Sequence, residues 1–155
     1  MIKLLDILKE AKQAGMLYHY TMLDRLKNII ISNTLEASTP EDTGSTHKDY
    51  SGPAISFTRT KYKPQSIVTN ESDAALVIDG NKLSNNYKLI PFQDSEVPDD
   101  EMEERIFGDI PNIDQYIIKV ILFKDEFDED IIPLLKEKNI PYEIKPVRVY
   151  FNNED

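Results

Sequence analysis

The sequence contains no cysteine and only two histidines, His19 and His47. Without cysteine, the chain can form neither a disulfide framework nor a thiolate metal site. A zinc site would have to take carboxylates at most of its ligand positions, so we expect no structural metal.

Long apolar runs are missing as well. Residues 1–6 lack the uninterrupted apolar stretch of a signal peptide, and no window approaches the roughly 20 apolar residues that a membrane span needs. We therefore expect a soluble, cytoplasmic protein with no membrane partner.

Acidic residues outnumber basic ones, 28 to 18, which gives a net charge of −10. A field of that sign repels phosphate backbones and argues against broad nucleic-acid binding, although a local basic groove is still compatible with it. Much of the acid lies in residues 94–104 and 125–130, where solvated loops are the ordinary interpretation. The length of 155 residues and the 40% apolar content indicate one folded domain, residues 1–155.

Hydrophobic periodicity predicts an α+β protein, because several strands are interrupted by few helices and show no regular strand–helix repeat. The predicted helices cover 2–11, 21–30 and 131–135, with a helical turn at 81–86. Thr21 with Asp24 three residues later indicates a capped start for the second helix. The predicted strands cover 16–20, 35–37, 54–58, 74–78, 87–92, 104–108, 116–123 and 147–151.

Three short polar motifs stand at the edges of apolar, strand-like runs. The first is His19-Tyr20-Thr21. A histidine at a strand end can donate a hydrogen bond to a ribose hydroxyl while an adjacent aromatic ring packs on a flat ring. The ordinary alternative is that Tyr18 and Tyr20 pack a core face and leave His19 exposed at its rim.

The second motif is the strand that ends in Ser56-Phe57-Thr58-Arg59. Alternation puts the hydroxyls of Ser56 and Thr58 on one side, the expected site side, and Phe57 on the other as a core anchor. Arg59 could clamp a pyrophosphate through two parallel hydrogen bonds, although a solvent-facing arginine on an edge strand fits the residue type equally well.

The third motif is the acidic segment Glu101-Met102-Glu103-Glu104, which leads into Arg105-Ile106. A carboxylate fixed at a strand edge can stabilise the positive charge that builds on a sugar as its glycosidic bond breaks. The alternative is a run of loop acids before a strand.

Together these motifs resemble the ADP-ribosyltransferase superfamily, particularly DarT-like toxins and related bacterial and phage proteins. The resemblance covers about residues 16–123 and is carried by His19-Tyr20-Thr21, by the Ser-x-x-Leu turn Ser32-Asn33-Thr34-Leu35, and by the two later motifs. It implies a split antiparallel β-sandwich with flanking helices and NAD as co-substrate.

The resemblance also implies roles for the candidate residues. His19 would hold a ribose of NAD, Tyr20 or Thr21 would line the nicotinamide pocket, and Ser56, Thr58 and Arg59 would belong to the cofactor-binding strand. Glu103 or Glu104 would be the catalytic acid. Glu103 is slightly favoured by the Glu-x-Glu spacing from Glu101, and Glu104 fits because it leads directly into the strand.

The sequence therefore predicts a mono-ADP-ribosyltransferase that transfers ADP-ribose from NAD to a macromolecular acceptor, either protein or nucleic acid. RNA 2′-phosphotransferase chemistry is a related alternative, but it normally needs several basic residues to hold the RNA phosphate, and this chain offers few in a cluster. From another class, a non-catalytic acidic binding protein, such as a phage inhibitor that mimics nucleic acid, would also suit the charge of −10.

Overall fold

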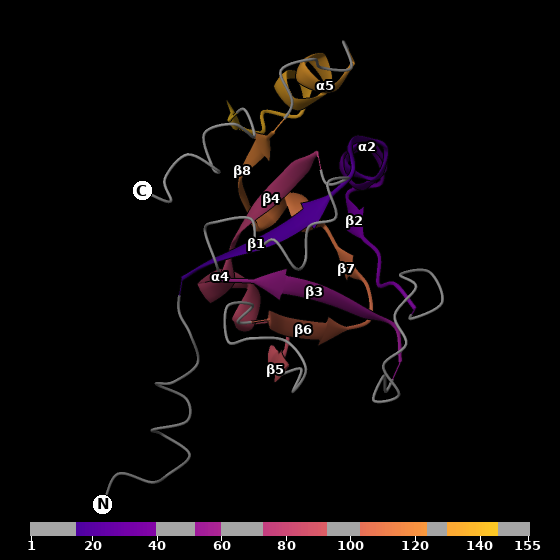
Figure 1. Cartoon of the computed structure of the whole chain (residues 1–155), viewed down its shortest axis with the longest axis vertical. Helices are drawn as coiled ribbons and strands as arrows, with labels where there is room; N and C mark the ends of the chain where they lie inside the picture. The colour runs from indigo at the N-terminus through magenta and orange to yellow at the C-terminus, as the bar shows by residue number, and fades with distance from the viewer. Residues whose placement is uncertain (1–14, 40–51, 60–72, 93–102, 124–129, 146–155) are drawn as a thin grey trace, which may run out of the picture.

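The computed structural model describes residues 15–39, 52–59, 73–92, 103–123 and 130–145 (Figure 1). Their strands are β1 (Met16–Thr21), β2 (Thr34–Leu35), β3 (Ala54–Thr58), β4 (Ala74–Asp79), β5 (Ile90–Phe92), β6 (Glu103–Phe107), β7 (Ile110–Pro111), β8 (Ile117–Leu122) and β9 (Tyr142–Ile144). Their helices are α2 (Leu23–Ser32), α4 (Gly80–Ser84), a 3-10 turn (Ile113–Gln115) and α5 (Ile131–Glu137).

Seven of the strands form one sheet in the order β5-β6-β3-β1-β4-β8-β9, and β2 pairs with β7 in a second, small sheet. Every pairing between these strands is antiparallel except that of β8 with β9. A large, mostly antiparallel sheet with few helices confirms the α+β prediction in this general form.

The two faces of the sheet carry different apolar clusters. The larger cluster joins one face of the sheet to the buried residues Leu26, Ile29 and Ile30 of α2 and Ile131 and Leu135 of α5. Figure 1 shows α2 and α5 near one end of the sheet. The smaller cluster lies on the opposite face and consists of Tyr18, Ala75, Val77, Ile121 and Phe123, with Tyr20 packed against it.

Helix α2 does not begin with the predicted Thr21 cap, so that prediction is wrong. Its N-cap is Met22, which makes no capping bond through its side chain. Thr21 is the last residue of β1, buried and paired with Ala74, because the strand runs one residue further than predicted. Instead the Asp73 carboxylate accepts a hydrogen bond from the Leu23 amide at 3.4 Å, so a residue fifty positions away caps this helix.

Most predicted elements within the described residues are confirmed to within a residue or two. The strand predicted over 87–92 is shorter, since only Ile90–Phe92 pairs. The strand predicted over 116–123 is observed as Ile117–Leu122, and Ile118 within it is 39% exposed. Strands β7 and β9 were not predicted. The helix predicted over 2–11, the strand over 147–151 and most of the predicted loops lie outside the described residues.

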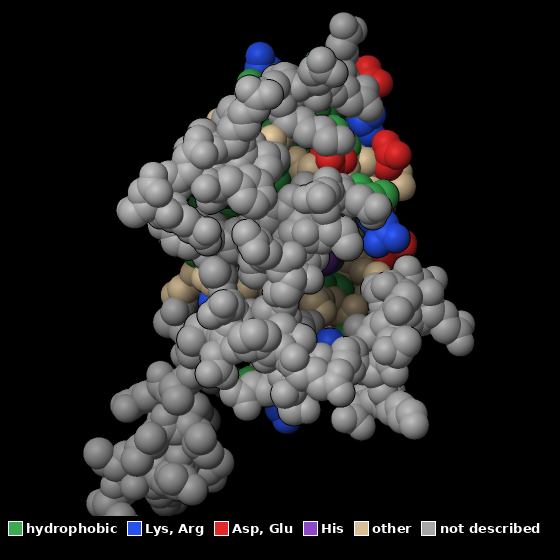
Figure 2. Space-filling model, in the orientation of Figure 1, with side chains coloured by type: hydrophobic (Ala, Val, Ile, Leu, Met, Phe, Trp, Pro, Cys, Tyr) green, Lys and Arg blue, Asp and Glu red, His purple; other side chains and the backbone are tan. Residues whose placement is uncertain are grey.

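None of the helices that the structure describes is long and apolar enough to cross a membrane. On the face drawn in Figure 2, acidic and basic side chains are interspersed along the edge formed by α2 and α5. The described part of that edge therefore does not form a patch of a single sign.

Candidate functional site

Strands β1 and β3 share fewer registered pairs than any other two neighbouring strands of the seven-stranded sheet. Strands β1 and β4 share six registered pairs, whereas β1 and β3 share one, Tyr18↔Thr58. Figure 1 shows these two strands diverging from that end of the pair toward α2. The backbone groups beyond Tyr18 in β1 and before Thr58 in β3 therefore do not continue the ladder.

The His19 imidazole occupies the place where the ladder stops. Its Nδ1 lies 2.9 Å from the backbone carbonyl oxygen of Ser56 in β3. A carbonyl oxygen can only accept, so Nδ1 carries the proton and donates it. In the neutral ring, this tautomer leaves the Nε2 lone pair as a hydrogen-bond acceptor.

The surroundings of His19 keep the ring in that neutral form. Burial lowers the pKa of the His19 imidazole below its ordinary value of 6.5, the hydrogen bond to Ser56 opposes this, and the positive charge of Arg25 lowers the pKa further. The residue as a whole is only half-buried. At neutral pH the accepting Nε2 is therefore the expected state.

A row of side chains crosses three strands on the face that carries His19. The His19 ring lies against the Phe57 ring of β3, with centroids 5.8 Å apart and planes tilted by 59°. Phe57 is in register with Glu104 of β6. Residues directly opposite each other in a ladder project to the same side, so the imidazole, the phenyl ring and the carboxylate share one face. His19 and Glu104 lie on strands that are two strand spacings apart, about 10 Å.

Glu104 is a buried carboxylate held by one arginine. Glu104 is 4% exposed, and its Oε1 forms an ion pair with the guanidinium of Arg59. Among the described residues, Glu104 Oε2 and Arg59 Nε are buried atoms without a hydrogen-bond partner. Buried polar atoms are nearly always satisfied in folded proteins, so these two are unusual. Burial also lowers the pKa of Arg59, although a guanidinium remains charged in proteins.

The other predicted cofactor-binding residues divide between the two faces. Thr21 is on the same face as His19 and is buried. Tyr20 is on the opposite face, where its ring stacks on Phe123 at 6.0 Å and 21°. Ser56 and Thr58 also project to that opposite face, because Thr58 is paired with Tyr18, which belongs to the smaller cluster, and Ser56 lies two residues along the same strand.

The structure thus places His19, Thr21 and Glu104 on one face of the sheet and pairs Glu104 with Arg59, whereas Tyr20, Ser56 and Thr58 project to the other face. Ser56 still meets the histidine, but through its backbone carbonyl and not its hydroxyl. Arg59, for which the sequence predicts a pyrophosphate contact, has Glu104 as its partner.

The register also separates the two candidate acids. Glu103 lies opposite Thr58, and its side chain is outside what the structure describes. Glu104 lies opposite Phe57, in the row that contains His19. Of the two candidate acids, Glu104 is therefore the one that shares a face with His19, whereas the spacing in the sequence slightly favoured Glu103.

Two residues near the site were not predicted as functional. Phe57 is confirmed as a core anchor, since it is 1% exposed and belongs to the larger apolar cluster, and its ring also packs against the imidazole of His19. Arg25, in the first turn of α2, lies close enough to His19 to affect its pKa. An arginine six residues after the histidine in an amphipathic helix is the available signal for Arg25, and on its own it is weak.

Within the described ranges, no group of three or more His, Asp or Glu side chains lies close enough together to hold a metal ion. No protein-family model matches the sequence. A search of the curated proteins returns no match either.

Proposed function

We propose that the protein is an NAD-dependent mono-ADP-ribosyltransferase with an ADP-ribosyltransferase-like fold. The observation that carries the proposal is the row His19, Phe57, Glu104 on one sheet face, at the point where β1 and β3 separate. In this proposal the single registered pair between β1 and β3 is the split between two halves of the sheet, and NAD binds across it.

His19 supplies the ribose contact. Because the Nδ1–H of His19 donates to the backbone carbonyl of Ser56, a neutral His19 offers Nε2 as an acceptor, and a ribose hydroxyl can donate to it. The sequence alone suggested that the imidazole donates this bond. The tautomer held by Ser56 reverses that direction in our proposal, and the hydroxyl donates to the ring.

Glu104 supplies the anion for the bond-breaking step. The bond between the nicotinamide nitrogen and the ribose carbon breaks, and its electron pair leaves with nicotinamide. The sugar carbon becomes positively charged, and a fixed carboxylate in a site that excludes water stabilises that charge strongly. The acceptor nucleophile then bonds to the same carbon and releases its proton.

The acceptor is a macromolecule, either protein or nucleic acid, and the charge of −10 favours a protein or another basic partner. The alternative of a non-catalytic acidic mimic needs a surface of one sign. The acidic stretches that suggest it, 94–104 and 125–130, lie mostly outside the described residues, so the same activity assay has to decide between the two proposals.

The test is transfer of label from adenylate-labelled NAD to protein and nucleic-acid fractions of a lysate, measured together with release of nicotinamide. We expect transfer by the wild type, a loss of at least about 100-fold in Glu104→Gln, and a loss in His19→Ala that is mainly in KM. Lys119→Gln breaks an ion pair with Glu143 between β8 and β9 and serves as the matched control, with activity unchanged.

Absence of both transfer and nicotinamide release in the wild type would refute the enzyme proposal. Activity retained in Glu104→Gln but lost in Glu103→Gln would keep the reaction and move the catalytic acid to the other glutamate.

A further inference from the structure

The Glu104 carboxylate is buried, although the proposed reaction needs it in its ionised form. The side chains of Glu104 and Arg59 are only 6% and 16% exposed. Burial by itself favours the neutral acid, because an ionised carboxylate loses its hydration. Something in the fold must offset that penalty if Glu104 is to act as an anion.

Within the described residues, Arg59 is the charged group in contact with this carboxylate. From β3, Phe57 lies directly opposite Glu104, and from β5 the opposing residue is Pro91, so neither carries charge. From β1, His19 lies beyond the Phe57 ring. On β6 itself, Arg105 follows Glu104 and therefore projects to the other face.

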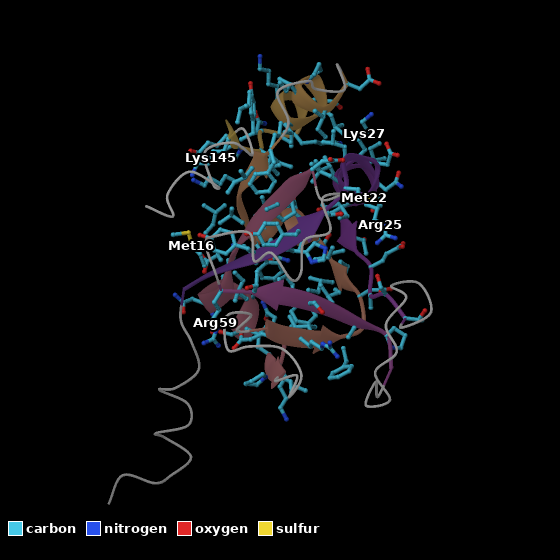
Figure 3. The ribbon with its side chains drawn as sticks, viewed as in Figure 1. Met16, Met22, Arg25, Lys27, Arg59 and Lys145 are labelled. Carbon is cyan, nitrogen blue, oxygen red and sulfur yellow. The ribbon has the colours of Figure 1, made fainter. Side chains whose placement is uncertain are left out.

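The contact is also selective between the two carboxylate oxygens. The Arg59 guanidinium takes Oε1, while Oε2 is buried and has no hydrogen-bond partner among the described residues. One oxygen is thus fixed by a rigid, planar donor, and the other is buried without a donor among the described residues. Figure 3 shows Arg59 at the end of β3 that is distant from α2 and Arg25. The two arginines therefore lie in different parts of the molecule.

We propose that Arg59 is a positioning residue that keeps Glu104 ionised and fixes the orientation of its carboxylate through Oε1. This role rests on the proposed function of Glu104 and differs from a contact between Arg59 and the pyrophosphate. Arg59 acts through Glu104 by supplying the counter-charge and the orientation that a buried carboxylate requires.

The experiment measures the titration of Glu104 and the pH profile of nicotinamide release in the same set of proteins. Glutamate side chains are labelled with ¹³C at the carboxyl, and Glu104 is assigned by its absence in Glu104→Gln. The variants are Arg59→Gln, which removes the charge, and Arg59→Lys, which keeps the charge but not the planar donor. Lys119→Gln is again the matched ion-pair control.

In Arg59→Gln we expect the Glu104 signal to titrate at higher pH than in the wild type, because burial is no longer opposed by a positive charge. Nicotinamide release should then fall by about tenfold or more at pH 6 and recover toward high pH. In Arg59→Lys, Glu104 should titrate near the wild-type pH, while kcat falls and KM changes little, because orientation alone is lost. Lys119→Gln should resemble the wild type in both measurements.

Two outcomes would overturn the inference. One is a Glu104 titration that is the same in the wild type and in Arg59→Gln. The other is a loss of activity that is equal at every pH, or that lies only in KM for NAD. If Arg59→Gln does not fold, Arg59→Lys tests the inference instead. Its Glu104 titration and its separate effects on kcat and on KM are then the deciding measurements. If the wild type releases no nicotinamide, the proposed function fails, and the carboxyl titration still tests the action of Arg59 on Glu104.

Discussion

At the scale of single residues, His19 shows how one hydrogen bond can assign a chemical role. The carbonyl of Ser56 fixes the proton on Nδ1, and burial together with Arg25 holds the ring neutral. A neutral, singly donating imidazole is a different binding group from a cation, since its free nitrogen can only accept. The proposed ribose contact depends on that distinction.

The lowered pKa of His19 predicts a pH dependence of stability. The unfolded chain takes up a proton at His19 near pH 6.5, whereas the folded protein resists it, so the free energy of unfolding decreases as pH falls below about 6.5. Above that pH the ring is neutral in both states and contributes no further change. We expect His19→Gln, whose amide can still donate to Ser56, to weaken this decrease.

The measurement is urea unfolding of wild type and variant between pH 8 and pH 5. His47→Gln is the matched control, because it removes the only other histidine of the chain. A wild-type curve that falls no faster than that of His19→Gln would contradict the assigned burial of the ring.

Gly80, the first residue of α4, is fixed by a close approach of two backbones. Its amide donates to the carbonyl of Gly15 at 2.9 Å, and a Cβ at this position would lie 2.4 Å from that same oxygen and 3.0 Å from the Leu17 side chain. Because the obstacle is backbone, Gly80→Ala should lower the free energy of unfolding by about 1–3 kcal/mol. Asn81→Ala, at an exposed position of the same helix, should change it by less than about 0.5 kcal/mol in urea unfolding.

A Gly80→Ala protein as stable as the wild type would mean that the backbone of Gly15, just before β1, does not approach Gly80 as closely as the structure shows.

At the scale of elements, the hydrophobic pattern, in which successive side chains of a strand alternate between two faces, predicted β1, β3 and β4 well, because each is a short and largely apolar run with a clear start and end. The same alternation could not say which faces of different strands coincide. A shift of one residue in pairing reverses the side that a strand presents, and the pairing between β1, β3 and β6 is set by long-range contacts. For that reason His19 was grouped with Ser56 and Thr58 but shares its face with Phe57 and Glu104.

The short strands β7 and β9 were missed for a related reason. Ile110–Pro111 and Tyr142–Ile144 contain two and three residues, which is too few to show a period. Their pairing partners, β2 and β8, are distant in sequence and carry no local signal for them.

The capping of α2 by a residue distant in sequence, Asp73, gives an element-scale prediction. Asp73 precedes β4 and accepts from the Leu23 amide, so it satisfies the helix start and complements its dipole. Asp73→Ala should lower the free energy of unfolding by about 1 kcal/mol, and Asp73→Asn by less, since the amide oxygen can still accept. Chemical denaturation of both proteins and of Asp24→Ala, an exposed acid in the first turn, provides the comparison.

If Asp24→Ala costs more than Asp73→Ala, the helix is stabilised locally, as the sequence had suggested, and the long-range cap is of minor importance.

At the scale of the whole molecule, the sequence supplied the residue types of the site and their order along the chain, and the sheet order supplied their adjacency. β6, β3 and β1 are neighbours in the sheet although they are far apart in the sequence. The ion pair between Arg59 and Glu104 could not be predicted, because it joins the end of one strand to the start of another through a register that no local pattern encodes.

The account depends on NAD binding across the face that carries His19 and Glu104, and NMR titration with NAD tests this most directly. We predict that the His19 Nε2 and Glu104 carboxyl signals shift together in one saturable step, while the carboxyl signal of Glu143, paired with Lys119 on β8, does not move. His19→Ala should weaken the binding. Saturable shifts confined to residues of the opposite face, such as Tyr20 and Thr58, or no shift at any NAD concentration, would contradict the account.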